Sequence, residues 1–172
     1  MDKQQIALKL ALDGLGIGFK MDTFDDRLIL QKAVYLAQAK GVNLGYYYSW
    51  YLYGPYTSAL ARDAFEIEGE LGEGFDDSEG WQLDEDCQNL LEELRELFRE
   101  VDRAKLARKL ELLASVHFIV RRKQVDKVTA EKIRVKLEAF NKPFTEGEIK
   151  TALVELKDYG LLSGGRPGQN NR

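Results

Sequence analysis

The sequence predicts a mainly α-helical, compact domain with one short aromatic β-strand or hairpin. Apolar residues recur at helical spacing through most of the chain, N-cap and glycine signals bound these stretches, and aromatic residues that favour strands concentrate in residues 46–53. The 172 residues correspond to one domain, and their 44% hydrophobic content is enough for a buried core. We therefore predict a single domain over residues 1–162 and a flexible tail over residues 163–172.

Two helices are predicted before the aromatic segment. Apolar spacing indicates a short helix over residues 6–14, which a run of glycines then stops. Thr23 is typical of an N-cap followed by an acidic first turn, and the helix that it opens runs to about Lys40, before Gly41. Apolar residues cover more than one face of this second helix, so we expect it to be central and mostly buried.

The aromatic segment is expected to end at residues 54–55, a Gly-Pro pair. Thr57 or Ser58 can then cap a third helix. Residues 66–86 are acidic and rich in glycine, which predicts a loop or a fraying helix end, with a short strand at residues 81–83.

Four helices are predicted in the second half of the chain. A leucine-rich helix covers residues 84–101, and a helix with a basic last turn covers residues 102–123. A third covers residues 129–140, and a capping box opens the last one, over residues 145–160. The last two have the spacing of a helix-turn-helix, but four carboxylates against two lysines in the final helix oppose DNA reading by it.

Charge is distributed unevenly along the chain. Residues 1–102 hold 9 Lys/Arg against 21 Asp/Glu, whereas residues 103–136, here called the basic block, hold 11 against 3. The basic block is typical of a surface for nucleic acid or an acidic partner. The alternative is that it faces the acidic first part of the chain across an intramolecular helix pair. The sequence favours this alternative, because an acidic helix immediately precedes the basic block.

No residue pattern indicates catalysis or a metal. His117 is the only histidine and lies on an apolar stripe, which predicts a semi-buried ring bonded to a backbone or carboxylate group. Cys87, the only cysteine, lies on the leucine stripe, where packing is the expected role. Glycine-rich phosphate loops are absent, and residues 66–86 lack the ligand pattern of an EF-hand. We therefore predict a non-enzymatic protein without cofactors or bound metal.

The second helix and the aromatic segment resemble a known family. The stretch LQKAVYLAQ at residues 30–38, followed by WYLYGPY at residues 50–56, is similar to the Panacea domain, also called the SocA-like antitoxin domain. Members show an LQKLxYLA helix, an aromatic strand that ends in YGP, and then a helix. The resemblance covers about residues 5–160 and points to a branch of small bacterial and archaeal proteins.

The resemblance implies a helical domain that binds other proteins. Antitoxin members neutralise a toxin encoded beside them, and one is an adaptor that delivers its toxin to a protease. The family has no shared catalytic residues. The expected function is therefore a protein-interaction module, antitoxin-like or phage-defence-associated, whose partner is a toxin or a defence protein.

The predicted binding surface is the aromatic segment. Six tyrosines and Trp50 between residues 46 and 56 cannot all face inward if the segment is a strand, because successive side chains alternate between faces. Either one aromatic face is a protein interface, or helices cover both faces and each phenol finds a hydrogen bond. The candidate partner-binding residues are Tyr46, Tyr48, Trp50, Tyr53, Gly54 and Tyr56, with Lys32 and Arg62 as charge partners.

Other partners are weaker expectations. A nucleic-acid-associated regulator that uses the basic block is the alternative function. The basic block and the leucine-rich helix could each support a homodimer, and neither requires one. No apolar run approaches the roughly 18–20 residues of a membrane helix, and residues 1–5 lack the features of a secretory signal, so we expect a cytoplasmic protein without membrane contact.

Overall fold

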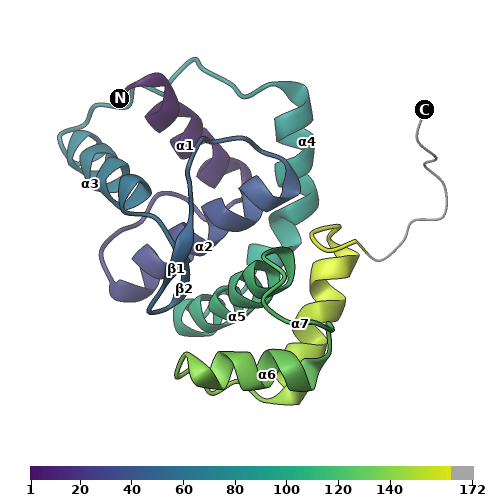
Figure 1. The fold of residues 1–172 in the computed structure, drawn as a ribbon. Coiled ribbons are helices and arrows are strands. Elements are labelled where there is room, and N and C mark those ends of the chain that lie inside the picture. The colour runs from purple at the N-terminus through teal and green to yellow at the C-terminus, as the bar shows by residue number, and fades with distance from the viewer. Residues whose placement is uncertain (164–172) are drawn as a thin grey trace. The chain divides into compact units, whose positions relative to one another are not determined.

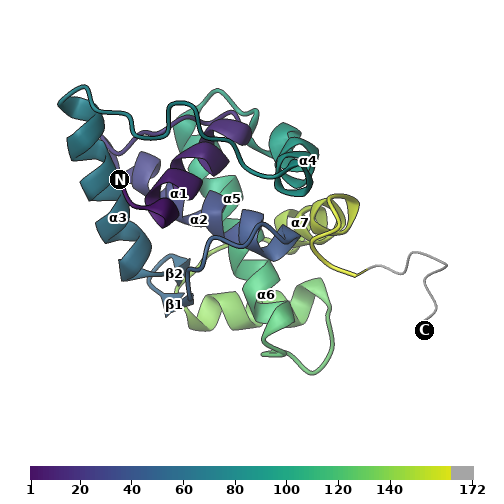
Figure 2. The ribbon, with the colours of Figure 1, turned by 90° about the horizontal axis from the view of Figure 1, so that it is seen from above.

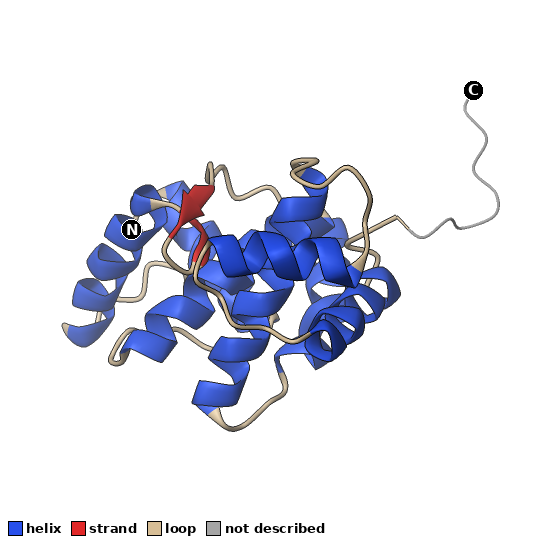
Figure 3. Cartoon of the chain, turned by 60° about the horizontal axis from the view of Figure 1, so that its bottom comes forward, coloured by secondary structure: helices blue, strands red, loops and turns tan. Residues whose placement is uncertain are grey.

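The structure is a computed structural model that describes residues 1–163, and it confirms the mainly helical prediction. Seven α-helices and one two-stranded antiparallel hairpin occur in this range (Figure 1 and Figure 3). The chain divides into two compact units, and the boundary along the sequence falls within helix α5 (Arg103–Arg121): residues 1–115 make the first unit, and the second begins at Val116. The single-domain assignment stays a prediction, and the predicted tail lies, from residue 164 onward, outside the described residues.

The second helix begins at its predicted cap, Thr23, and the first begins earlier than predicted. Helix α1 (Lys3–Gly14) opens with a capping box, and so does α2 (Phe24–Lys40), in which Thr23 and Asp26 bond to each other's backbone amides. Gly41 terminates α2 with a φ of 124°, which a glycine adopts without strain. Nearly every residue in the middle of α2 is buried, as expected for a central helix.

The aromatic segment forms a hairpin, which is one of the two predicted possibilities. Strand β1 (Ser49–Tyr51) pairs antiparallel with β2 (Gly54–Tyr56), so that Trp50 lies opposite Pro55. The expectation that the Gly-Pro pair ends the strand was therefore wrong, because residues 52–53 form the turn and the Gly-Pro pair belongs to β2, where it pairs with β1. A proline is tolerated in an edge strand of so small a sheet.

Two predictions between residues 73 and 101 were wrong. Helix α3 (Ser58–Gly72) follows the hairpin, and the segment after it has no strand at residues 81–83. The leucine-rich stretch is not one helix, because α4 (Glu85–Leu94) tightens into a 3₁₀ turn, η1 (Arg95–Phe98). Val101, placed on the apolar stripe by its spacing, is 91% exposed. The apolar stripe therefore stops at the 3₁₀ turn, where the helical spacing ends.

The last helix opens at its predicted capping box, and the two helices before it begin close to their predicted starts. Helix α5 begins one residue after Asp102, α6 (Ala130–Ala139) is capped by Thr129, and α7 (Glu146–Asp158) opens with the predicted capping box. Helices α6 and α7 pack against each other (Figure 2). No described helix combines the length and the apolar character needed to span a lipid bilayer.

Helix α2 organises the core of the first unit. It contacts α1, α3, α4 and strand β2. Its apolar side chains are buried together with those of the surrounding helices, among them Leu8, Leu12, Ile29, Leu60 and Leu94. One end of α2 and the hairpin that it contacts are the elements that form the candidate site.

Candidate functional site

The first unit contains a pocket of about 360 Å³ that is lined by α2, the hairpin and α3. We call it the aromatic pocket. Its volume is at the lower end of the roughly 300–1,000 Å³ that is usual for small-ligand sites. Its lining residues are Met21, Phe24, Arg27, Leu28, Leu30, Gln31, Lys32, Tyr51, Leu52, Tyr53, Tyr56, Ala61, Ala64 and Phe65.

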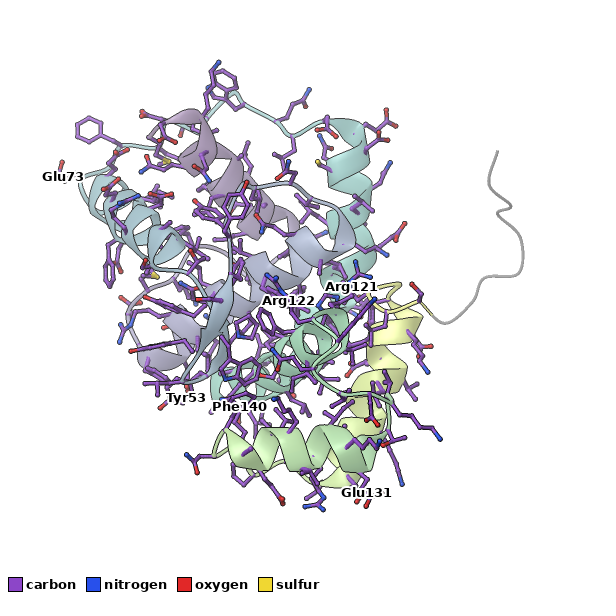
Figure 4. All side chains as sticks on the ribbon, in the orientation of Figure 1. Tyr53, Glu73, Arg121, Arg122, Glu131 and Phe140 are labelled. Carbon is purple, nitrogen blue, oxygen red and sulfur yellow. The ribbon has the colours of Figure 1, made fainter. Side chains whose placement is uncertain are left out.

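The hairpin contributes three exposed residues to the pocket lining. Leu52 is 67% exposed, Tyr51 56% and Tyr53 45%. The Tyr53 ring packs edge-on against that of Phe24, at 5.0 Å between centroids, and the rings of Tyr51 and Tyr56 lie 5.3 Å apart. Figure 4 shows Tyr53 beside the strands, at the opposite end of α3 from Glu73. These contacts hold several aromatic rings close together while much of their surface remains in water.

Two polar side chains of α2 hold strand β2 against the helix. Lys32 is 1% exposed, and its Nζ donates a hydrogen bond of 2.6 Å to the Pro55 carbonyl. The Gln31 side-chain amide bonds both the carbonyl and the amide of Thr57, at 2.9 and 3.2 Å. A side-chain amide can thus replace a neighbouring strand as a backbone partner. The position of the hairpin therefore follows from two adjacent residues of α2.

Gly54 is required by the packing at the turn. Its φ is +83°, and a Cβ built on it would lie 2.4 Å from the Oγ of Ser115. No ordinary side chain fits this distance. The Ser115 hydroxyl is itself buried and has no hydrogen-bond partner among the described residues.

Ionic contacts fix the beginning of α2 near the pocket. Asp26 accepts hydrogen bonds from Arg103 at 2.5 and 2.8 Å and from Thr23 at 2.7 Å. Burial by itself raises the pKa of the Asp26 carboxyl, but these hydrogen bonds outweigh it and lower the pKa below its ordinary value. Asp26 is therefore a carboxylate at neutral pH, committed to Arg103.

Tyr46 and Tyr48 direct their hydroxyls inward. The Tyr46 hydroxyl donates to Asp63 at 2.8 Å, and burial together with this carboxylate raises its pKa. The Tyr48 hydroxyl donates to the Gln31 carbonyl at 3.1 Å, burial raises its pKa, and its ring packs edge-on against Tyr35. These two tyrosines are therefore hydrogen-bonded inside, whereas Tyr51, Tyr53 and Tyr56 line the pocket. That the exposed aromatic face is a protein interface stays a prediction.

The structure brings together only some of the predicted partner-binding residues. Lys32, Tyr53 and Tyr56 line the aromatic pocket. Trp50 is half-buried in β1 and is not part of the lining, although it precedes two residues that are. Arg62 is exposed on α3 and is also outside the lining.

Sequence reasoning missed several lining residues. Phe24, Arg27 and Phe65 line the pocket from α2 and α3, and Tyr51 and Leu52 line it from the hairpin. One signal was present in the sequence. Phe65 is an apolar residue of α3 that lies outside the buried face of this helix, and its side chain is 54% exposed. An amphipathic helix with an apolar residue beyond its core face is a sign of a binding surface.

His117 lies in the second unit. Its ring bonds to a backbone group, as predicted, and is buried rather than semi-buried. It is 4% exposed, and its Nε2 lies 3.1 Å from the Leu161 carbonyl oxygen. Burial lowers the pKa of the imidazole to about 4. The ring is therefore neutral at pH 7, and because a carbonyl can only accept, Nε2 carries the proton.

Cys87 and the carboxylates of residues 1–163 are not arranged as metal ligands. The Cys87 thiol is half-buried, and burial and the nearby Asp84 raise its pKa, so that the thiol stays protonated at neutral pH. Among residues 1–163, no three His, Cys, Asp or Glu side chains are grouped to hold a metal ion.

Part of the charge of the basic block is paired within each unit. Arg103 pairs with Asp26 of α2 in the first unit. In the second, Lys132 pairs with Asp126 at 2.6 Å, and Arg134 pairs with a carboxylate of α6 and one of α7. The partner of Arg103 thus lies in α2, within the acidic first part of the chain that the basic block was expected to face.

Comparison of the chain with protein-family models, curated proteins and solved structures found no match. The resemblance to the Panacea domain therefore rests on residues 30–38 and 50–56. These residues form most of α2 and the hairpin, which are the two elements that contribute most of the aromatic pocket.

Proposed function

We propose that this chain is a non-enzymatic protein-interaction module, antitoxin-like or phage-defence-associated, that binds a partner protein through the aromatic pocket. The observation that carries the proposal is the group of large apolar side chains that remain exposed around this pocket. Phe24, Tyr51, Leu52, Tyr53 and Phe65 each keep between 45% and 67% of their surface in water. Five such residues around one concavity are typical of an interaction site.

The chemistry of the lining also supports binding. The described lining residues include no carboxylate, imidazole, thiol or aliphatic hydroxyl. Aromatic rings give large contact areas with few rotatable bonds, so a partner that covers them loses little side-chain entropy at the interface. The hairpin turn is held by bonds from α2 to β2, and such rigidity lowers the cost of binding.

Capture of the partner by pocket variants tests the proposal. The tagged chain and its Tyr53→Ala and Phe65→Ala variants would be purified from the native host, each after a circular dichroism check of folding. Phe75→Ala is the matched control, since Phe75 is 61% exposed and outside the lining. We expect a stoichiometric partner with the wild type and Phe75→Ala, and loss of it with both pocket variants. Equal capture by all four proteins would contradict the proposal.

The antitoxin-like part has its own test. The captured partner would be expressed alone and together with this chain, and growth would be followed. A toxin arrests growth alone, and the wild-type chain relieves the arrest while Tyr53→Ala does not. A partner without any effect on growth would contradict the antitoxin-like role, while the proposal of a protein-interaction module would stand.

A further inference from the structure

We infer that the aromatic pocket selects a partner segment in which a large apolar side chain is followed by a carboxylate. The inference rests on the proposed function and adds the chemistry of the segment that enters the pocket. It comes from the charges of the lining.

The lining has the opposite charge to the part of the chain that forms it. Residues 1–102 hold 21 Asp/Glu against 9 Lys/Arg. The lining nevertheless contains two cations, Arg27 and Lys32, and none of its described residues is acidic. A cleft lined by one sign of charge attracts ligands of the other sign. An acidic group is therefore the charged group that this pocket accepts.

Arg27 is the cation that an incoming carboxylate can reach. It is half-buried, and its Nη1 donates to the carbonyls of Met21 and Asp22, at 2.9 and 3.4 Å. These backbone partners are uncharged. Its Nε and Nη2 make no hydrogen bond to the described residues, and a guanidinium with free N–H groups is suited to a carboxylate.

The neighbouring carboxylate does not neutralise Arg27. Asp26, the preceding residue, is bonded to Arg103 and Thr23. Within residues 1–163, the positive charge of Arg27 is thus paired only with carbonyl dipoles.

The rest of the lining specifies the other half of the ligand. Most lining side chains are aromatic or aliphatic, and the pocket volume of about 360 Å³ suits one or two side chains. Burial of an apolar side chain supplies the affinity, and the carboxylate beside it contacts Arg27. An acidic–hydrophobic peptide segment combines both features.

Three probes separate the two halves of the inference. They are the N-acetylated, C-amidated dipeptides Phe-Glu, Phe-Gln and Phe-Lys, titrated into the full-length ¹⁵N-labelled chain at low salt. We expect the Phe-Glu probe to bind about tenfold more tightly than Phe-Gln, and Phe-Lys most weakly, because a hydrogen bond to a charged group exceeds one to a neutral group. Shifts should concentrate at pocket residues such as Tyr53.

Two charge-matched variants locate the effect. Arg27→Gln should reduce the Phe-Glu preference to about twofold or less, whereas Arg62→Gln, which removes an exposed charge from α3 outside the lining, should keep it. The comparison of probes on the wild type stands even if Arg27→Gln does not fold.

The possible failures are distinguishable. Equal binding of Phe-Glu and Phe-Gln at the pocket, or tighter binding of Phe-Lys, overturns the acidic preference and leaves the proposed function in place. The same holds if no probe shifts the pocket residues while Phe65→Ala still abolishes partner capture. Partner capture that survives Phe65→Ala overturns the proposed function itself.

Discussion

Gly54 shows how a single residue fixes the site. Its left-handed φ and its approach to Ser115 leave no room for a Cβ, so the turn that carries Tyr53 depends on it. From the sequence we predicted that the strand ends at Gly54, because a glycine before a proline usually indicates a turn. The reason for the glycine is a contact with a residue 61 positions later in the chain, which no local pattern contains.

We expect Gly54→Ala to destabilise the protein by about 2–4 kcal/mol, from the left-handed φ and from the clash with the Ser115 Oγ. Ser115→Ala should be neutral or slightly stabilising, since it removes a buried hydroxyl without a partner. Chemical denaturation measures both. The double variant should recover the part that is due to the clash, and a double variant as unstable as Gly54→Ala would show that the clash is not the cause.

His117 predicts a pH dependence of stability. Its pKa is about 4 in the folded chain, against an ordinary value of 6.5. Between these values the unfolded chain binds more protons than the folded one, so the stability is fully present above about pH 6.5 and falls as the pH drops toward 4. The loss from this residue approaches about 3 kcal/mol.

Denaturation curves at several pH values measure this dependence. His117→Gln, which can still donate to the Leu161 carbonyl, should flatten the curve between pH 4 and 6.5. The same slope in the wild type and in the variant would contradict the assignment to His117.

The cap at the N-terminus of α2 stabilises the helix that contributes the most residues to the pocket lining. Thr23 caps the helix through its hydroxyl and through Asp26, which in turn holds Arg103. We expect Thr23→Ala to cost about 1 kcal/mol, while Thr23→Ser, which keeps the hydroxyl, stays near the wild type. Thermal unfolding followed by circular dichroism distinguishes the two, and equal melting temperatures would mean that the cap contributes nothing.

Helix boundaries were predictable wherever the signal was local. Thr23 and Thr145 each cap a helix as predicted, because a cap is formed by residues within three positions of it. Thr129 was predicted as the start of a helix and is its cap. The leucine-rich stretch was not predictable in the same way. Leu97 and Phe98 keep helical spacing and are buried, yet the backbone there is 3₁₀.

The candidate site was only partly predictable for a related reason. The sequence located the aromatic segment and predicted a strand or hairpin there, with successive side chains on alternate faces. In the structure the backbone of Tyr46 pairs with the side-chain amide of Gln38, at 2.8 and 2.9 Å, and not with a strand. The alternation of faces is therefore lost before β1, and the inward direction of Tyr46 could not be read from the period of two.

At the scale of the whole molecule, the two proposed kinds of partner respond differently to salt. Partner capture through apolar rings should survive nuclease treatment and about 0.5 M salt, because hydrophobic contact is little screened. Binding of nucleic acid by the basic block would weaken steeply with salt. Co-purification at low and high salt, with and without nuclease, measures this, and loss of all bound material with nuclease would favour the nucleic-acid alternative.

The most direct test of the aromatic pocket is calorimetric titration of the captured partner into the wild type, Phe65→Ala and Phe75→Ala. We predict that Phe65→Ala weakens binding by more than about tenfold, as truncation of a central aromatic anchor does, and that Phe75→Ala changes it by less than about twofold. Equal affinities of the two variants for the partner would contradict binding through the pocket.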